Sequence, residues 1–231
     1  PAPTEGSPSL LSLTNADTFF HEFGHALHGM LSNVRYGSLA GTSTPRDFVE
    51  FPSQVMEYWM RSTEVLTSFA RHYETGEAIP QDIIDKIQAS AAFNQGFGTV
   101  ETLAATYLDM AYHTLDSPEA VEPRAFESAA MQDIGLIEEI IPRYRSGYFQ
   151  HIFAGGYSAG YYSYTWSEVI AADAFMAFQE TSLLDKDTAA RYREHILSKG
   201  GSLPGMELYR NFRGRDPDIG PLLKARGLDG S

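Results

Sequence analysis

The sequence predicts a mainly α-helical fold with minor β structure, and two kinds of observation support this prediction. Apolar residues recur at helical spacing and make a stripe along residues 14–33, formed by Phe19, Phe23, Leu27, Met30 and Leu31. Capping signals precede two helical stretches. Residues 14–17 have the spacing of a capping box, and residues 44–47 supply an N-cap residue, a proline at the first helical position and an acidic residue in the first turn. We expect the helix 14–33 to be largely buried, with its histidine face turned to a cleft.

The remaining chain divides into helices joined by loops that contain glycine and proline. A long helix is expected from residue 45 to about residue 72, kinked at Pro52 because proline lacks a backbone N–H. The other expected helices are two within 80–114 around a loop at 94–98, then 123–147, 162–180, 185–198 and one after a turn at 200–205. Residues 1–13 should be extended, with short strands at 10–13 and 36–40.

Length and composition limit the class of protein. The 231 residues suffice for one large helical domain or two small ones. No run approaches the roughly 20 apolar residues that span a membrane, and no secretory signal is visible. The absence of cysteine fits a reducing compartment, and the net charge of −13 would repel nucleic-acid phosphates. We therefore expect a cytoplasmic protein that binds neither nucleic acid nor membrane.

Residues 21–25 have the pattern H-E-x-x-H inside the first expected helix. His21 and His25 lie one turn apart on the same face and can bind one metal ion, for which Zn²⁺ is the suitable choice. Glu22 lies about 100° round the helix, close enough to polarise a metal-bound water without being a ligand. The pattern also occurs by chance. Gly24 costs helix stability of about 1 kcal/mol relative to alanine, which close packing by another backbone would explain.

A catalytic zinc site of this type needs a third protein ligand. The metzincin arrangement requires glycine at position 28 and histidine at position 31, and the chain has His28 and Leu31 instead. An acid from the downstream helix remains, and the candidates are Asp47, Glu50, Glu57 and Glu64. Glu50 lies between apolar residues just before a proline, where a carboxylate needs a charged partner. A surface acid on an amphipathic helix is the alternative.

Residues 155–164 contain three glycines and four tyrosines, which is not the composition of a core helix. Glycine permits a mobile loop, and the hydroxyls of Tyr157, Tyr161 and Tyr164 can donate hydrogen bonds to a developing oxyanion. A tyrosine-rich packing segment explains the composition equally well. His72 and His113 are expected to be surface or hydrogen-bonded core residues rather than metal ligands.

Four motifs, taken in order, resemble the thimet oligopeptidase family of zinc peptidases. They are HEFGHALH at 21–28, Gly41-Thr followed by PRDFVEFPSQ at 45–54, HIFAGGYSAGYY at 151–162, and FRGRDP at 212–217 with PLLKARGL at 221–228. The last two are most similar to bacterial peptidyl-dipeptidases, also called dipeptidyl carboxypeptidases. The resemblance covers nearly the whole chain and implies a helical zincin catalytic lobe of the neurolysin type.

The resemblance also implies a role for each matching residue. The implied roles are one Zn²⁺ bound by His21, His25 and Glu50; Glu22 as general base; Tyr157 and Tyr164 as oxyanion and substrate clamps; His151 and Tyr161 as substrate contacts; and His28 as a supporting residue. Short peptides are the implied substrates. The implied activity is release of C-terminal dipeptides, and endo-oligopeptidase activity is the alternative.

Members of this family are much longer, and their helical N-terminal half forms the opposite wall of the substrate channel. The chain begins in a Pro/Ser-rich segment shortly before the H-E-x-x-H helix. We therefore expect residues 1–231 to be the C-terminal catalytic domain of a longer peptidase, whose N-terminal half is a possible partner required for activity. Arg210, Arg213 and Arg215 are candidates for binding a substrate carboxylate, or are a solvated basic helix end.

Overall fold

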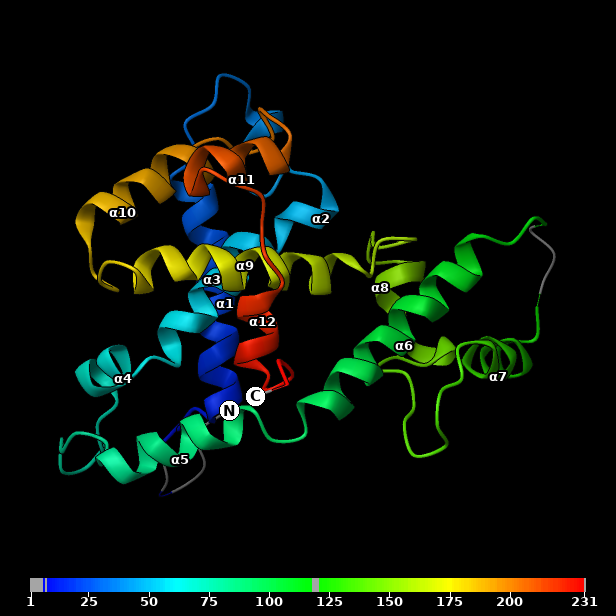
Figure 1. Ribbon diagram of the computed structural model, residues 1–231, viewed down its shortest axis with the longest axis horizontal. Coiled ribbons are helices and arrows are strands. Elements are labelled where there is room, and N and C mark those ends of the chain that lie inside the picture. Colours follow the sequence, from blue (N-terminus) through cyan, green and yellow to red (C-terminus); the bar gives the residue numbers. More distant parts are fainter. Residues whose placement is uncertain (1–5, 7, 118–120, 231) are drawn as a thin grey trace.

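The computed structural model describes residues 6, 8–117 and 121–230, and its regular structure is helical (Figure 1). The α-helices are α1 (Leu13–Met30), α2 (Arg46–Val49), α3 (Phe51–Met60), α4 (Thr63–Phe69), α5 (Gln81–Ala91), α6 (Gln95–His113), α7 (Pro123–Asp133), α8 (Gln150–Phe153), α9 (Ser163–Gln179), α10 (Lys186–Tyr192), α11 (Gly205–Arg213) and α12 (Gly220–Ala225). The shorter elements are 3₁₀ turns at Gly37–Leu39 and Ser146–Tyr148 and a π-helical segment at Arg193–Leu197. The prediction of a mainly α-helical fold is confirmed.

Neither expected short strand forms. Residues 8–12 have no regular structure and Leu13 opens α1, while residues 36–40 contain the 3₁₀ turn. A strand is stable only beside a partner strand, and the described residues contain a single isolated β-bridge, between Arg71 and Ala78. The extended start expected over 1–13 falls partly on residues 1–5 and 7, outside the described residues. Within the described part, no helix combines the length and the apolar character needed to cross a membrane.

The helices form two groups (Figure 1). Helices α6, α7 and α8 lie together on one side, and the other helices lie around α3 and α9. In the larger group α1 packs against α3, and α3 packs against α9. The larger group has a core around Phe51, Phe178 and Tyr209 and a smaller cluster of Met60, Leu66 and Ile84, and the smaller group has a core around Leu108 and Phe149. The loop 154–162 joins α8 in the smaller group to α9 in the larger group.

The apolar stripe of α1 is not buried as expected. Phe19 and Met30 keep 63% and 66% of their surface exposed, and the buried residues of the helix are Gly24 and His28. Helical spacing identifies residues that share a face but does not say which face meets a neighbour, and here the histidine face meets α3. The cap also differs, because the Ser12 hydroxyl, rather than Thr14, accepts a hydrogen bond from a backbone N–H of the first turn.

The long helix expected over 45–72 is divided into α2, α3 and α4 rather than kinked. Pro52 lies in the first turn of α3, where a missing N–H costs no helical hydrogen bond. Ser62 caps α4, and its hydroxyl accepts from the N–H of Val65 at 3.3 Å. The break leaves Glu50 between α2 and α3.

The helix expected over 123–147 ends at Asp133. Gly135 has a φ of +68° and donates to the Gln132 carbonyl at 2.9 Å, and Leu136 donates to the Met131 carbonyl at 3.0 Å. This is a Schellman motif, which ends a helix at a left-handed glycine. The two helices within 80–114, and those over 162–180 and 185–198, are confirmed within a few residues, except that the last one continues as a π-helical segment.

Candidate metal centre

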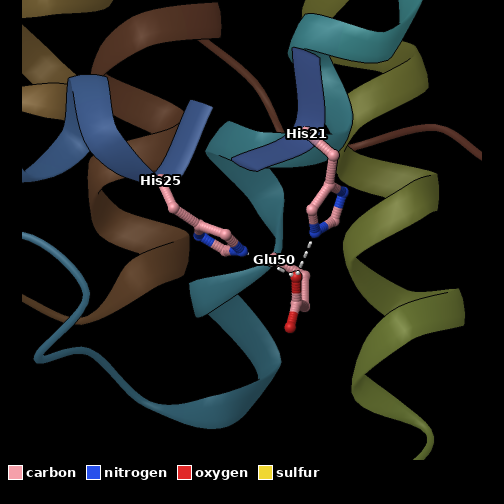
Figure 2. A group of neighbouring side chains, drawn as sticks. All are labelled: His21, His25 and Glu50. Carbon is pink, nitrogen blue, oxygen red and sulfur yellow. Dashed lines mark ion pairs between the residues drawn. The ribbon is translucent and has the colours of Figure 1, made fainter. Parts of the chain in front are cut away.

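His21, His25 and Glu50 converge at one point between α1 and α3 (Figure 2). The Nε2 atoms of both histidines lie 3.2 Å from the same carboxylate oxygen, Glu50 Oε2. The two imidazole rings are nearly perpendicular, at 84°, with centroids 4.9 Å apart. The structure therefore brings together the three residues that the sequence proposed as metal ligands.

This convergence follows from local structure and one close helix contact. The two histidines are one turn apart on α1, and Glu50 occupies the junction between α2 and α3. Gly24 lies against α3 so closely that a Cβ atom there would be 2.5 Å from Ser53 Cα and 2.8 Å from the Pro52 carbonyl oxygen. The expectation that backbone packing explains Gly24 is confirmed.

The three side chains can hold a metal ion. Tetrahedral Zn²⁺ with bonds of about 2.0–2.1 Å places neighbouring ligand atoms about 3.3 Å apart. The two nitrogen-to-oxygen separations of 3.2 Å match this spacing, and Glu50 is buried, with 4% of its surface exposed. Two imidazoles and one carboxylate also form the donor set of catalytic zinc sites, which keep a further position open.

Glu57 orients one of these histidines, a role that sequence reasoning did not find. His21 Nδ1 lies 2.7 Å from Glu57 Oε1, on the ring edge opposite the Nε2 that faces Glu50. A carboxylate on the second ring nitrogen fixes the tautomer and orientation of a metal-binding histidine. Glu57 follows Glu50 by seven residues, two helical turns, and this spacing was the available signal. It was read only as a possible third ligand.

Hydrogen bonds within the cluster set the pKa values of its residues. Burial lowers the pKa of His21, but hydrogen bonds to Glu50 and Glu57 outweigh burial and raise the pKa to about 10. Burial would raise the pKa of Glu50, but hydrogen bonds from His21, His25 and Tyr157 hold this pKa well below its usual range. A metal ion must therefore displace a proton from His21.

The other polar residues of α1 differ in exposure. Glu22 is exposed and forms no ion pair within the described part of the chain. His28 is fully buried, and neither of its ring nitrogens has a hydrogen-bond partner among the described residues. Burial, followed by the neighbouring charge of His25, lowers the pKa of His28 to about 4. His28 is therefore a neutral core side chain beside the cluster.

Tyr157 of the loop 154–162 reaches the cluster, and Tyr164 at the start of α9 stacks on Tyr157. The Tyr157 hydroxyl donates to Glu50 Oε1 at 2.5 Å, and the rings of Tyr157 and Tyr164 are stacked with centroids 5.1 Å apart. The Tyr164 carbonyl accepts from Gln54 Nε2 at 3.1 Å, which ties the start of α9 to α3. Burial raises the pKa of both hydroxyls, so both stay protonated donors at neutral pH.

His151 and Tyr161 lie in an aromatic cluster behind these tyrosines. The His151 ring is 6.2 Å from the Tyr157 and Tyr164 rings, and burial lowers its pKa. Tyr161 is 6% exposed and packs edge-on against Phe149. The loop thus combines both readings of its composition, with Tyr157 at the cluster and Tyr161 inside the packing.

Arg46 is a second residue that sequence reasoning missed. Its guanidinium lies over the Tyr157 ring, 4.8 Å from the centroid, and against Gly156, where a Cβ would be 2.8 Å from Nη2. Gly156 has a φ of +80°, so it satisfies both a left-handed backbone and this close contact. No spacing in the sequence links position 46 to position 157.

The remaining candidates lie elsewhere. Asp47 and Glu64 are not part of the metal-binding group. The three arginines proposed for a substrate carboxylate are all in ion pairs: Arg210 with Asp216, Arg213 with Glu180 and Arg215 with Asp173. These contacts argue against substrate binding by the three arginines, but the alternative of a solvated helix end does not hold for Arg213, whose side chain is only 6% exposed. His72 is exposed and accepts backbone hydrogen bonds, and His113 contacts Asp109.

The fold and the site together define a class of protein. A histidine pair one turn apart on one helix, completed by a glutamate from the next helices, is the ligand arrangement of gluzincin metallopeptidases. The chain belongs to peptidase family M3, whose family model matches residues 1–228. The predicted resemblance is thereby confirmed.

Individual relatives agree with this membership. The chain is 45% identical to a dipeptidyl carboxypeptidase of Escherichia coli (strain K12) over 229 residues, 98% of this chain and 34% of the relative. It is 38% identical to oligopeptidase A of the same organism, in a match that covers 99% of this chain and 34% of the relative. It is 34% identical to a thimet-like oligopeptidase of Dictyostelium discoideum, in a match that covers 98% of this chain and 34% of the relative. The chain thus spans about a third of the length of these relatives.

Proposed function

We propose that this chain is the catalytic domain of a longer zinc-dependent peptidase that hydrolyses short oligopeptides. The observation that carries the proposal is the convergence of two imidazole Nε2 atoms on one buried carboxylate oxygen, each at 3.2 Å. Membership of the M3 family supports the reaction class, and the relatives named for peptidase activities support peptide substrates.

His21, His25 and Glu50 would hold the zinc ion. When bound, the ion supplies Lewis-acid polarisation of a carbonyl and lowers the pKa of water. Glu22, exposed on the helix that carries both histidines, accepts a proton from the attacking water and delivers it to the leaving amine. Glu57 keeps the His21 ring oriented throughout.

Tyr157 and Tyr164 supply hydrogen bonds to the oxyanion that forms at the cleaved carbonyl. Their raised pKa values keep both hydroxyls protonated, as a donor requires. Tyr157 now donates to Glu50, so its hydroxyl must leave this carboxylate to reach a substrate. The neighbouring glycines 155, 156 and 160 give the loop the freedom for that movement. His151 would contact the substrate beside these tyrosines, whereas Tyr161, buried in the aromatic packing, would support them from behind.

The favoured specificity is release of C-terminal dipeptides, and internal cleavage of oligopeptides is the alternative. The names of the relatives include both activities. A matched peptide pair with a free and an amidated C-terminus separates them. Cleavage lost on amidation identifies a peptidyl-dipeptidase, whereas equal cleavage of both peptides identifies an endo-oligopeptidase.

The experiment that tests the proposal is hydrolysis of a short quenched-fluorescent peptide by the zinc-loaded chain, with and without a chelator. We expect cleavage that the chelator abolishes and zinc restores. Cleavage that persists in chelator, or a chain that binds no zinc, would overturn the proposal. One bound zinc per chain without cleavage would identify a lobe that needs the remainder of the longer enzyme, and adding that remainder should then restore turnover.

A further inference from the structure

Asp109, in α6, is a fully buried carboxylate outside the chemistry described above. It accepts hydrogen bonds from two backbone N–H groups of the loop 154–162, from Ala159 to Oδ1 at 2.9 Å and from Tyr161 to Oδ2 at 2.8 Å. One helical turn further along α6, His113 Nδ1 is hydrogen-bonded to the Asp109 backbone carbonyl at 2.8 Å and lies at the same distance from Asp109 Oδ1. The carboxylate therefore binds the loop backbone on one side and has an imidazole beside it.

The loop has a conformation that calls for such an acceptor. Ala159 has a φ of +52°, a left-handed conformation that residues with a Cβ rarely adopt. Other N–H groups of the loop donate locally, that of Tyr157 to the His151 carbonyl in α8 at 3.0 Å and that of Gly160 to the Tyr157 carbonyl within the loop at 2.8 Å. Neighbouring N–H groups around a left-handed residue form a concavity that binds an anion, and Asp109 provides that anion.

The loop is therefore held by carboxylates at two points. Asp109 binds the backbone at positions 159 and 161, and Glu50 binds the side-chain hydroxyl of Tyr157. A movement of Tyr157 from Glu50 to a substrate breaks the second contact and leaves the first intact. The contact with α6 is thus suited to be the fixed point of the movement.

We propose that Asp109, supported by His113, is a positioning residue that anchors the tyrosine loop while Tyr157 moves. The anchor fixes where the loop turns, and thereby the positions from which the tyrosine hydroxyls can reach a substrate. The catalytic consequence rests on the proposed function, whereas the anchor itself rests only on the hydrogen bonds above.

The test compares Asp109→Asn with Asp173→Asn. An asparagine has one acceptor oxygen in place of two, so its NH₂ group meets one of the two loop N–H groups as donor to donor. Asp173, in α9, is a matched control, because it is also fully buried but accepts from Tyr209 and Arg215 instead of the loop. His113→Gln is a milder second variant that keeps the carboxylate and a side-chain donor.

Amide hydrogen exchange is measured in the whole zinc-loaded chain for 154–162, α1 and α9. In Asp109→Asn we expect exchange in the loop at least about tenfold faster, with α1 unchanged and zinc affinity as in the wild type. His113→Gln should give a smaller increase confined to the loop, and Asp173→Asn should leave the loop unchanged. Loop exchange that stays at the wild-type rate in both Asp109→Asn and His113→Gln, or that rises equally in α1, would overturn the proposal. If Asp109→Asn does not fold, the His113→Gln result decides.

Kinetics provide a second readout where the chain hydrolyses peptide. A misplaced oxyanion donor should lower kcat and kcat/KM by the same factor, about tenfold, and leave KM unchanged. A rise in KM with unchanged kcat would contradict a role for the anchor in positioning Tyr157. If the wild-type chain does not hydrolyse peptide, the proposed function fails or needs the rest of the enzyme, and the exchange measurements still decide the anchor.

Discussion

The substitution Gly24→Ala tests whether one glycine sets the distance between the helices that carry the candidate ligands. A Cβ at position 24 would lie 2.5 Å from Ser53 Cα, whereas ordinary contact begins at 3.4 Å. The difference between these values, about 0.9 Å, is the movement that α1 and α3 must make apart. The two distances of 3.2 Å from the histidine Nε2 atoms to Glu50 Oε2 run from α1 to the start of α3. They would therefore widen as the two helices move apart.

The size of the effect follows from where the strain falls. In the metal-free chain the helices can relax apart, but zinc binding must draw them together again and restore the overpacking, which costs about 1–3 kcal/mol. At about 1.4 kcal/mol for each tenfold change, zinc affinity should fall by about 5- to 150-fold. Alanine also has the higher helix propensity, so the metal-free variant should remain folded.

The assay is a zinc titration in competition with a chromogenic chelator, beside thermal unfolding of the metal-free chain. The control is Gly29→Ala in the same helix, where an added Cβ has no atom within 4 Å. That variant should gain up to about 1 kcal/mol of helix stability without a change in zinc affinity. A Gly24→Ala chain that binds zinc within twofold of the wild type would refute the argument.

Three further predictions concern the same centre. Glu22→Gln should lower kcat by about 10²–10⁴-fold while zinc stays bound; near-normal turnover, measured beside metal content, would exclude Glu22 as the general base. Glu57→Ala should weaken zinc binding by about 10–100-fold because His21 loses its orienting acceptor, and unchanged affinity in the chelator assay would contradict this role. The raised pKa of His21 stabilises the metal-free chain fully below pH 6.5, and this contribution should be lost as the pH rises towards 10. Over the same range zinc affinity should rise, because the proton competes less, and a flat pH profile in both measurements would argue against the raised pKa.

The parts of the site that the sequence predicted are those encoded by local spacing. His21 and His25 share a face because they are one helical turn apart, wherever the helix lies. The close contact at Gly24 was predicted because glycine is costly inside a helix without such a reason. Spacing alone left the third ligand open among four acids, since the choice of Glu50 depends on where α2 ends and α3 begins, and only the family resemblance singled out Glu50.

The parts that could not be predicted depend on contacts between distant segments. The apolar stripe of α1 indicated a helix but not its buried side, so Phe19 was wrongly placed in the core. Arg46 and Asp109 contact the tyrosine loop although they precede it in the sequence by about a hundred and about fifty residues, respectively. The ion pairs of Arg213 with Glu180 and of Arg215 with Asp173 likewise join distant segments, which no local pattern relates to each other.

The candidate ligands and the tyrosine loop lie far apart in the sequence, and this separation has a consequence for the order of folding. The three candidate ligands lie within residues 21–50, on helices that pack directly together, whereas Tyr157 meets Glu50 across 107 positions. Contacts between distant segments carry the larger loop-closure cost and tend to form later. We therefore expect pulsed hydrogen exchange during refolding to show protection in α1 and α3 before the loop 154–162, and simultaneous protection would contradict this order. In a chain that folds in this order, the candidate ligands are in place to bind a metal ion before Tyr157 reaches Glu50.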